Sequence, residues 1–197
     1  ERRASTRSFH SFEPLLRFFC FNCMDMVAAY RVTTHGGSLR GICQLKGGPY
    51  VTDESVEKII NQERRIFLNK SETFKKFAQR VEVLQYQLSE LLNKLKSDGK
   101  MIAGYGAPAK ATTLMYQFCI DHEVIDFIVD DSPFKQGLYS PGKHIYIVSP
   151  SEIEKQTPDF LLVFAWNFAK AIIDNNQEFK NKGGQFIICL LYTSPSP

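Results

Sequence analysis

The sequence predicts an α/β fold in which a long helix precedes a mostly parallel sheet with flanking helices. Three observations support this prediction. An apolar seam of heptad spacing runs from Phe74 to Leu95, short apolar segments alternate with helical ones after Lys100, and a glycine-rich turn joins the first such strand to its helix. The chain has 197 residues, of which 44% are apolar and 23% are charged. These values are ordinary for one globular domain with an extension.

The first part of the chain is expected to contain a helix and an extended pair. Residues 1–10 show no periodic pattern, so we expect them to be disordered or a remnant of a preceding domain. Apolar side chains recur at helical spacing over residues 11–27, which predicts a helix. Residues 29–44 have the pattern of two extended segments interrupted by His35-Gly36-Gly37-Ser38, where the glycines permit a turn. Thr52-Asp53-Glu54 then has the capping hydroxyl and acidic first turn of a helix start.

The helical and extended region over residues 11–98 is expected to end in a long helix. Its apolar seam is formed by Phe74, Phe77, Val81, Leu84, Leu88, Leu91 and Leu95. This seam has two interpretations: a coiled-coil dimer, or a long helix that packs along a globular domain. The second is favoured, because three heptads are close to the minimum for a coiled coil. Gly99 suits the left-handed position that ends such a helix.

Residues 99–190 are predicted to form the C-terminal domain. Strands are expected over residues 101–105, 124–129, 144–148, 159–165 and 185–190, and helices over residues 108–119, from residue 149 onward and over residues 167–180. Strands that alternate with helices predict a mostly parallel sheet with right-handed crossovers. The Ser- and Pro-rich residues 191–197 fit no element, and we expect them to be a non-native tail.

The composition argues against nucleic-acid, membrane and metal-binding functions. The net charge is only +3, the basic residues form no evident stripe, and no apolar run is long enough to span a membrane. Five cysteines at irregular spacing indicate reduced thiols in a cytoplasmic protein. Cys20 and Cys23 form one C-x-x-C pair, but no second pair follows to complete a structural zinc site. We therefore expect no metal, no nucleic-acid partner and no membrane partner.

The segment Gly104–Lys110 lies where a predicted strand becomes a helix, and it matches G-x-G-x-x-A, the relaxed dinucleotide fingerprint. In this pattern Gly104 permits a tight turn, Gly106 lets backbone N–H groups approach a phosphate, and Ala109 allows the helix to pack on the strand. Lys110 adds a positive charge one turn into the helix, whose N-terminus also favours an anion. The turn therefore predicts a Rossmann-like domain with an anion or nucleotide site.

Asp130 strengthens this prediction, because it follows the second strand close to where a ribose-binding acid stands in dinucleotide-binding domains. The fingerprint is weak evidence for NAD in particular, since many ligands use the same turn. A tight turn without any ligand is the alternative interpretation.

Two further segments carry candidate site residues. The loop from Asp130 to His144 leaves the carboxyl end of a strand. Within it, Lys135 and Lys143 could hold a diphosphate, and Tyr139 could stack on a ligand or donate a hydrogen bond to it. A solvated connection is the equally weighted alternative. His35, beside two glycines, could act as a general base, or it could be a hydrogen-bonded residue of a turn.

Five motifs in order along the chain extend these observations. They are Ser11–Leu16, Tyr30–Arg40 with His35-Gly36-Gly37-Ser38, Gly104–Lys110, Asp130–Ile145 and Ala165-Trp166-Asn167. Together they resemble the C-terminal domain of S-adenosylmethionine-dependent C-methyltransferases of the sugar type, such as those that act on nucleotide-linked deoxyketosugars. The resemblance runs from about residue 11 to residue 188.

The resemblance implies that this domain helps to hold a nucleotide-sugar in a class I methyltransferase. A base removes the proton next to a ketone, and the resulting enolate attacks the methyl sulfonium. The residues expected to contact substrate are Ser38, Gly104, Tyr105, Gly106, Ala107, Lys110, Asp130, Lys135 and Tyr139, with His35 as a candidate base near the interdomain cleft.

The ends of the chain depart from the family pattern. Residues 1–7 lack the Tyr-x-Glu-His-like segment that precedes this domain in the family, and the residues after Ile188 do not resemble its end. The expectation is therefore that the main base and the methyl-donor domain are missing, that the missing domain is a partner, and that this chain alone binds no S-adenosylmethionine. Two alternatives remain: a stand-alone nucleotide- or dinucleotide-binding module, and a protein that dimerises through its long helix.

Overall fold

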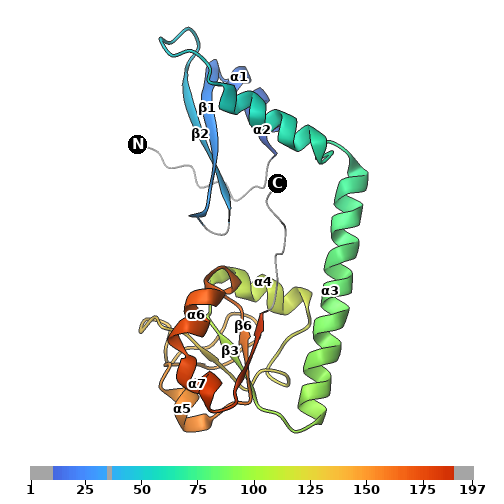
Figure 1. Ribbon diagram of the computed structural model, residues 1–197, viewed down its shortest axis with the longest axis vertical. Coiled ribbons are helices and arrows are strands. Elements are labelled where there is room, and N and C mark those ends of the chain that lie inside the picture. The colour runs from blue at the N-terminus through green and yellow to red at the C-terminus, as the bar shows by residue number, and fades with distance from the viewer. Residues whose placement is uncertain (1–10, 35–36, 189–197) are drawn as a thin grey trace. The chain divides into compact units, whose positions relative to one another are not determined.

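The computed structural model describes residues 11–34 and 37–188 (Figure 1). The chain divides into two compact units, Glu1–Gln79 and Arg80–Pro197. The second unit thus begins within the long helix, whereas the predicted C-terminal domain begins at residue 99. The predicted fold class is confirmed, because a five-stranded parallel sheet flanked by helices follows a long helix.

The first unit packs two helices against an antiparallel strand pair. α1 spans Phe12–Phe21 and α2 spans Glu54–Arg65, while β1 (Met24–Val32) pairs with β2 (Ser38–Leu45). Its apolar core consists of Phe12, Met26, Ala29, Val56 and Ile59, all less than a tenth exposed. The two extended segments predicted around the glycine turn are therefore a hairpin.

The first helix ends at Phe21, and the prediction that it continues to residue 27 is wrong. Cys23 adopts a left-handed φ of 55°, and its N–H donates to the Cys20 carbonyl at 3.1 Å, which closes the last turn. The following apolar residues then enter β1, where Met26 faces the core. Cys20 and Cys23 are both exposed, so they do not contribute to an apolar helix face.

The second helix begins where the sequence predicts, but its cap differs. The carboxylate of Asp53 accepts the Ser55 N–H at 2.8 Å, whereas the Thr52 hydroxyl contacts the Met26 carbonyl at 3.4 Å. The cap is therefore the acid and not the hydroxyl, as expected of an N-cap aspartate.

The long helix α3 spans Ser71–Ser97. Leu88 and Leu92 are buried in the core of the second unit, and Val81 and Leu95 pack against the same core. This packing agrees with the interpretation in which the seam lies along a globular domain. No helix within the described ranges is long and apolar enough to cross a membrane.

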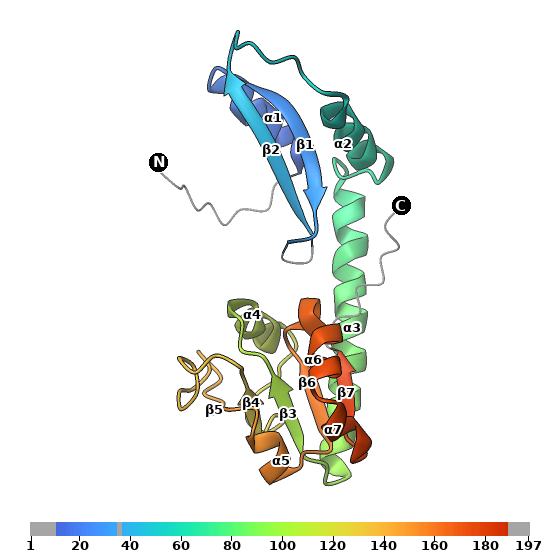
Figure 2. The ribbon, with the colours of Figure 1, turned by 60° about the vertical axis from the view of Figure 1, so that its left-hand side comes forward.

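The second unit is built on five parallel strands in the order β5-β4-β3-β6-β7. Their bounds are Ile102–Tyr105 for β3, Phe127–Val129 for β4, Ile147–Val148 for β5, Phe160–Val163 for β6 and Gln185–Ile188 for β7. Figure 2 shows β3 beside β6, with α6 and α7 over one face of the sheet. β3, β4, β5 and β6 each lie within their predicted ranges and are shorter, because the flanking residues belong to the connecting turns. β7 begins at residue 185 as predicted, and residues 189–190 of its predicted range lie outside the described residues.

Helices cover both faces of this sheet. Their bounds are Ala109–Gln117 for α4, Glu152–Gln156 for α5, Ala169–Asn175 for α6 and Gln177–Asn181 for α7, with a 3₁₀ turn, η2, over Trp166–Phe168. The single helix predicted over residues 167–180 is thus broken at Asn176. α3 and α4 pack on the face that buries Ile102 and Leu162, while α5, α6 and α7 pack on the face that buries Ala103 and Val163.

Candidate functional site

The order of the strands reverses between β3 and β6. From β3 the chain runs through α4 to β4 on one side, whereas β6 and β7 are added on the other side. Open α/β sheets bind ligands at such a switch point, beyond the carboxyl ends of the strands. A cavity of about 220 Å³ lies there, which we name the switch-point pocket. It is lined by Tyr105, Gly106 and Pro108 from β3 and its turn, by Asp130, Asp131 and Lys135 after β4, and by Ala165, Phe168 and Ile172 after β6.

The fingerprint turn is held tightly by its own backbone. Gly106 has a φ of 88°, and a Cβ at this position would lie 2.8 Å from the Cβ of Ala165. Its N–H donates to the Val129 carbonyl at 2.7 Å, and the next N–H, of Ala107, donates to the Asp130 carboxylate at 2.6 Å. Glycine is therefore required here by the left-handed backbone and by the close approach of the β6 segment.

The structure corrects the role expected of Gly104. This residue lies within β3 and is not part of the turn. A Cβ there would lie 2.5 Å from the ring of Phe164, so the missing side chain makes room for a buried aromatic ring. The tight turn depends instead on Gly106.

Asp130 connects the turn to the loop that follows β4. Its carboxylate accepts the Ala107 N–H, the Ser132 N–H at 2.9 Å and the Lys135 ammonium at 3.0 Å, and its carbonyl accepts the Gln136 amide at 2.9 Å. Burial of this group raises its pKa, but the two backbone donors and Lys135 outweigh burial and leave the pKa of Asp130 below its ordinary value. The group is therefore a carboxylate at neutral pH with most of its acceptor sites filled.

Tyr105 and Asp131 form the second polar contact of the pocket. The Tyr105 hydroxyl donates to Asp131 Oδ1 at 2.9 Å, while the Tyr105 ring is buried. Burial raises the pKa of Tyr105, the Asn176 amide acts in the opposite direction, and the negative charge of Asp131 raises it further. The hydroxyl therefore stays protonated and fixes the position of the Asp131 carboxylate.

Lys110 does not line the pocket. Its ammonium lies 4.0 Å from the centre of the Trp166 ring, a cation–π distance, and burial lowers the pKa of Lys110. The contact joins the first turn of α4 to η2, the two segments that follow the strands on either side of the switch point.

The remaining predicted site residues lie elsewhere. Tyr139 packs against Tyr146 with ring centres 5.2 Å apart, in a short antiparallel bridge of the loop between β4 and β5. Ser38 begins β2 in the first unit, where its hydroxyl donates to the Thr34 carbonyl at 2.9 Å. His35 lies outside the described residues. The pocket thus contains four residues of the predicted set: Tyr105, Gly106, Asp130 and Lys135.

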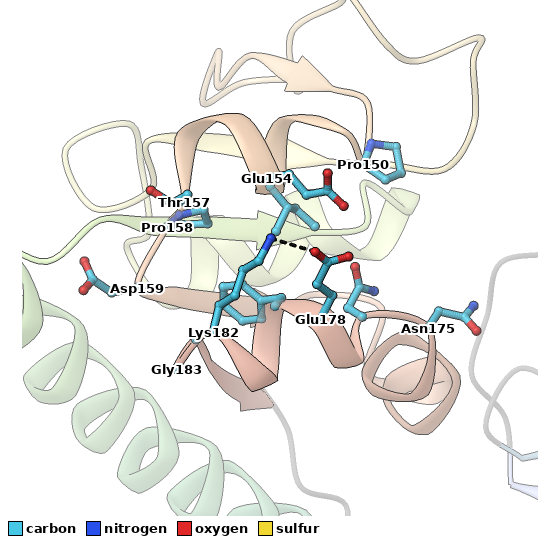
Figure 3. A pocket seen from close by; sticks show the side chains of 13 residues that line it. Pro150, Glu154, Thr157, Pro158, Asp159, Asn175, Glu178, Lys182 and Gly183 are labelled. Atoms are coloured by element: carbon cyan, nitrogen blue, oxygen red, sulfur yellow. Dashed lines mark ion pairs between the residues drawn. The ribbon is translucent and has the colours of Figure 1, made fainter.

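A second cavity, of about 250 Å³, lies between α5 and α7 (Figure 3). Asp159 and Gly183 on its wall precede β6 and β7, so it is near the amino ends of these strands. Glu178 and Lys182, which both line it, form an i,i+4 ion pair. Because ligands of open α/β sheets bind at the opposite ends of the strands, the switch-point pocket is the better candidate site.

Five of the nine residues that line the pocket were not among the predicted site residues, and Asp131 and Phe168 are two of them. Asp131 stands beside Asp130 in the loop, and a search for two consecutive acids after a strand would have found it. Phe168 is an exposed aromatic residue at the end of η2. Its place in the pocket could be found only from the topology, because it depends on β6 lying next to β3.

Comparison with known proteins agrees with this geometry and with the sequence motifs. Residues 33–190 match the family described as the C-methyltransferase C-terminal domain. The chain is also 34% identical over 181 residues to C-methyltransferase NovU of Streptomyces niveus; the match covers 92% of this chain and 43% of that protein. The chain therefore spans less than half the length of this relative. The resemblance inferred from the motifs is confirmed, and the chain belongs to the C-methyltransferase C-terminal domain family.

Proposed function

We propose that this chain is the substrate-binding part of a class I S-adenosylmethionine-dependent C-methyltransferase that acts on a nucleotide-linked sugar. Membership in the C-methyltransferase C-terminal domain family supports the reaction class. The observation that carries the proposal is the position of the switch-point pocket, where fixed polar groups and an apolar wall face the place at which this fold binds ligands.

The described residues do not fit S-adenosylmethionine as a whole. The pocket of about 220 Å³ is smaller than the roughly 300–1,000 Å³ that sites for drug-sized ligands usually have. Gly106 and Ala107 direct their N–H groups to Val129 and Asp130, so these two donors are not free for such a ligand. We propose that the methyl donor binds to a part of the longer family members that this match does not cover.

The proposed contribution of this chain to catalysis is to bind and orient the acceptor. Carbon methylation requires a proton to leave the carbon next to a carbonyl, and the acceptor must be held so that this carbon meets the methyl donor. Tyr105 and Asp131 provide a fixed polar contact, and Phe168 provides an apolar surface. His35 remains a prediction for a proton-accepting role.

A stand-alone dinucleotide-binding module is the second candidate function, and only the fingerprint favours it. In dinucleotide-binding domains the turn binds a pyrophosphate through free N–H groups. Here the equivalent donors are already paired within the chain. The paired donors therefore disfavour the dinucleotide module and leave the methyltransferase proposal as the better supported of the two.

The single tryptophan offers a direct test. Trp166 lies beside Ala165 of the pocket, so its fluorescence should respond to a bound ligand. Thymidine diphosphate glucose, NAD and S-adenosylmethionine would each be titrated into the 197-residue chain. We expect a saturable change with the sugar nucleotide and none with the other two. Saturation by NAD at lower concentration than by the sugar nucleotide would contradict the proposal in favour of the dinucleotide module.

A further inference from the structure

The turn that would bind a phosphate in this fold has no free donor in its first three positions. The Gly106 N–H is bonded to Val129, the Ala107 N–H is bonded to Asp130, and Pro108 has no N–H. Phosphate sites at strand–helix turns depend on these backbone donors. A phosphate group could therefore reach the Ala107 N–H only by displacing the Asp130 carboxylate.

The charges around the pocket also disfavour a phosphate group. The wall holds two carboxylates, Asp130 and Asp131, and one ammonium, Lys135, which leaves one net negative charge. The Lys135 ammonium is paired with Asp130 at 3.0 Å, and the nearby Lys110 lies over the Trp166 ring. These two lysines are thus engaged with groups of the chain, and the net negative charge of the wall disfavours a dianion.

Asp131 is well placed to accept hydrogen bonds from a ligand. Oδ1 of Asp131 takes one hydrogen bond, from Tyr105, and within the described ranges we find no other hydrogen bond to this carboxylate. An ionised carboxylate has about four acceptor positions. Because Tyr105 is buried and holds the group in place, Asp131 offers fixed acceptors that suit the hydroxyl groups of a ligand.

Phe168 forms the apolar side of the same pocket. Phe168 is 64% exposed although it belongs to a folded domain. The other apolar lining residues are Pro108, Ala165 and Ile172. An aromatic face beside a carboxylate suits a sugar ring, whose C–H groups are apolar and whose hydroxyl groups are donors. The volume of about 220 Å³ fits one such ring better than a whole nucleotide-sugar.

We propose that the switch-point pocket binds the hydroxyl groups of one sugar ring of the acceptor through Asp131, against the face of Phe168, and that it does not bind the phosphate groups. The inference rests on the proposed function for the identity of the acceptor. The pocket chemistry itself is independent of the methyl-transfer step, so the two can fail separately.

Calorimetric titration of the 197-residue chain with three ligands tests the inference. Thymidine diphosphate glucose contains both a sugar ring and phosphate groups. Glucose contains only the ring, and inorganic pyrophosphate contains only the phosphate groups. We expect heat from the sugar nucleotide and, at higher concentration, from glucose, but none from pyrophosphate. Asp131→Asn keeps an acceptor for Tyr105 but loses the charge, and it should weaken sugar-nucleotide binding about tenfold. Phe168→Ala should also weaken it.

The control variant is Asp174→Asn, which removes an exposed carboxylate that pairs with Lys170 on α6 outside the pocket. With each of the three ligands it should give the same heat of binding as the unmodified chain. Binding of pyrophosphate, or unchanged binding of glucose and the sugar nucleotide by Asp131→Asn, would overturn the inference. Binding of glucose without binding of the sugar nucleotide would refute the proposed function and leave the inference standing. Absence of heat from both sugar ligands would refute both.

Discussion

Asp130 holds the switch-point pocket in its shape. One carboxylate joins two segments, because it accepts from Ala107 in the turn after β3 and from the Ser132 backbone and the Lys135 side chain in the loop after β4. Hydrogen bonds that involve a charged group each stabilise a protein by about 1.5–3 kcal/mol. The ionised state of Asp130 should therefore affect stability as well as pocket geometry.

Replacing Asp130 with asparagine should reduce stability in a manner that depends on pH. The folded-state pKa of Asp130 is lowered, so its stabilisation is full above the unfolded-state pKa of about 3.9 and is lost as the pH falls through the folded-state pKa. Urea unfolding of the Asp130→Asn variant at pH 7 should show a loss of about 1–3 kcal/mol, which shrinks toward pH 3. Asp174→Asn, at an exposed i,i+4 pair, should lose less than about 0.5 kcal/mol. An equal loss for Asp130→Asn at both pH values would contradict this account.

Gly106 should be intolerant of any side chain. Gly106→Ala places a Cβ on a backbone with φ of 88° and within 2.8 Å of Ala165, so strain and overpacking add. Gly137→Ala is the matched control, because φ is 83° there and a Cβ would meet nothing within 4 Å. Thermal unfolding should show a loss of about 2–4 kcal/mol for Gly106→Ala and about 1–2 kcal/mol for the control. Equal losses of stability for the two variants would contradict a role of the close contact with Ala165.

For single residues, the sequence predicts which ones belong to the pocket better than it predicts their contacts. Gly106 and Asp130 stand in a fingerprint with known spacing, so their place in the pocket could be foreseen. The partner of Gly106 is Ala165, and the partner of Lys110 is Trp166. Both partners follow β6, and the pairing arises only when β6 is added beside β3.

Among the elements, the long helix α3 has two apolar stretches with different surroundings. Leu88 is 9% exposed in the core of the second unit, whereas Phe77 on the same heptad seam is 60% exposed. Periodicity assigns both residues to one face, and it cannot distinguish them because the surface that the helix meets is distant in sequence. The seam therefore predicts the helix and its apolar face, but not the extent of its contact.

Substitution along α3 should reveal that difference. Leu92→Ala removes a fully buried side chain and should reduce the free energy of unfolding by about 2–5 kcal/mol. Phe77→Ala removes an exposed one and should change it by less than about 0.5 kcal/mol. Guanidinium unfolding of the two variants provides the measurement. Similar losses for both would indicate that Phe77 is also covered, as a dimer formed through the seam would require.

Element boundaries were predicted less well than the elements themselves. The helix α1 stops at Phe21 because Cys23 takes a left-handed backbone and the next residues gain a partner strand. The predicted helix over residues 167–180 breaks at Asn176, whose side-chain amide donates to the Ile172 carbonyl at 2.7 Å. Neither event leaves a gap in the apolar spacing, so local pattern alone could not show it.

For the molecule as a whole, alternation of strands and helices was sufficient to predict the parallel sheet. The order β5-β4-β3-β6-β7 then places the fingerprint turn at the switch point of the sheet. The identity of the ligand cannot be obtained in this way, because the same topology serves many chemistries. Here the proposed ligand is inferred from the structure instead. The donors of the turn and the nearby lysines are already engaged within the chain, and Phe168 is exposed beside the pocket.

The most direct test of the central claim is to map the backbone amide shifts of the isotope-labelled chain during titration with thymidine diphosphate glucose. We predict that the largest shifts occur over residues 105–107, 130–135 and 165–168, which surround the switch-point pocket. Shifts concentrated over residues 153–159 and 175–184, which line the cavity between α5 and α7, would contradict the account. Absence of any shift at saturating sugar nucleotide would contradict it as well.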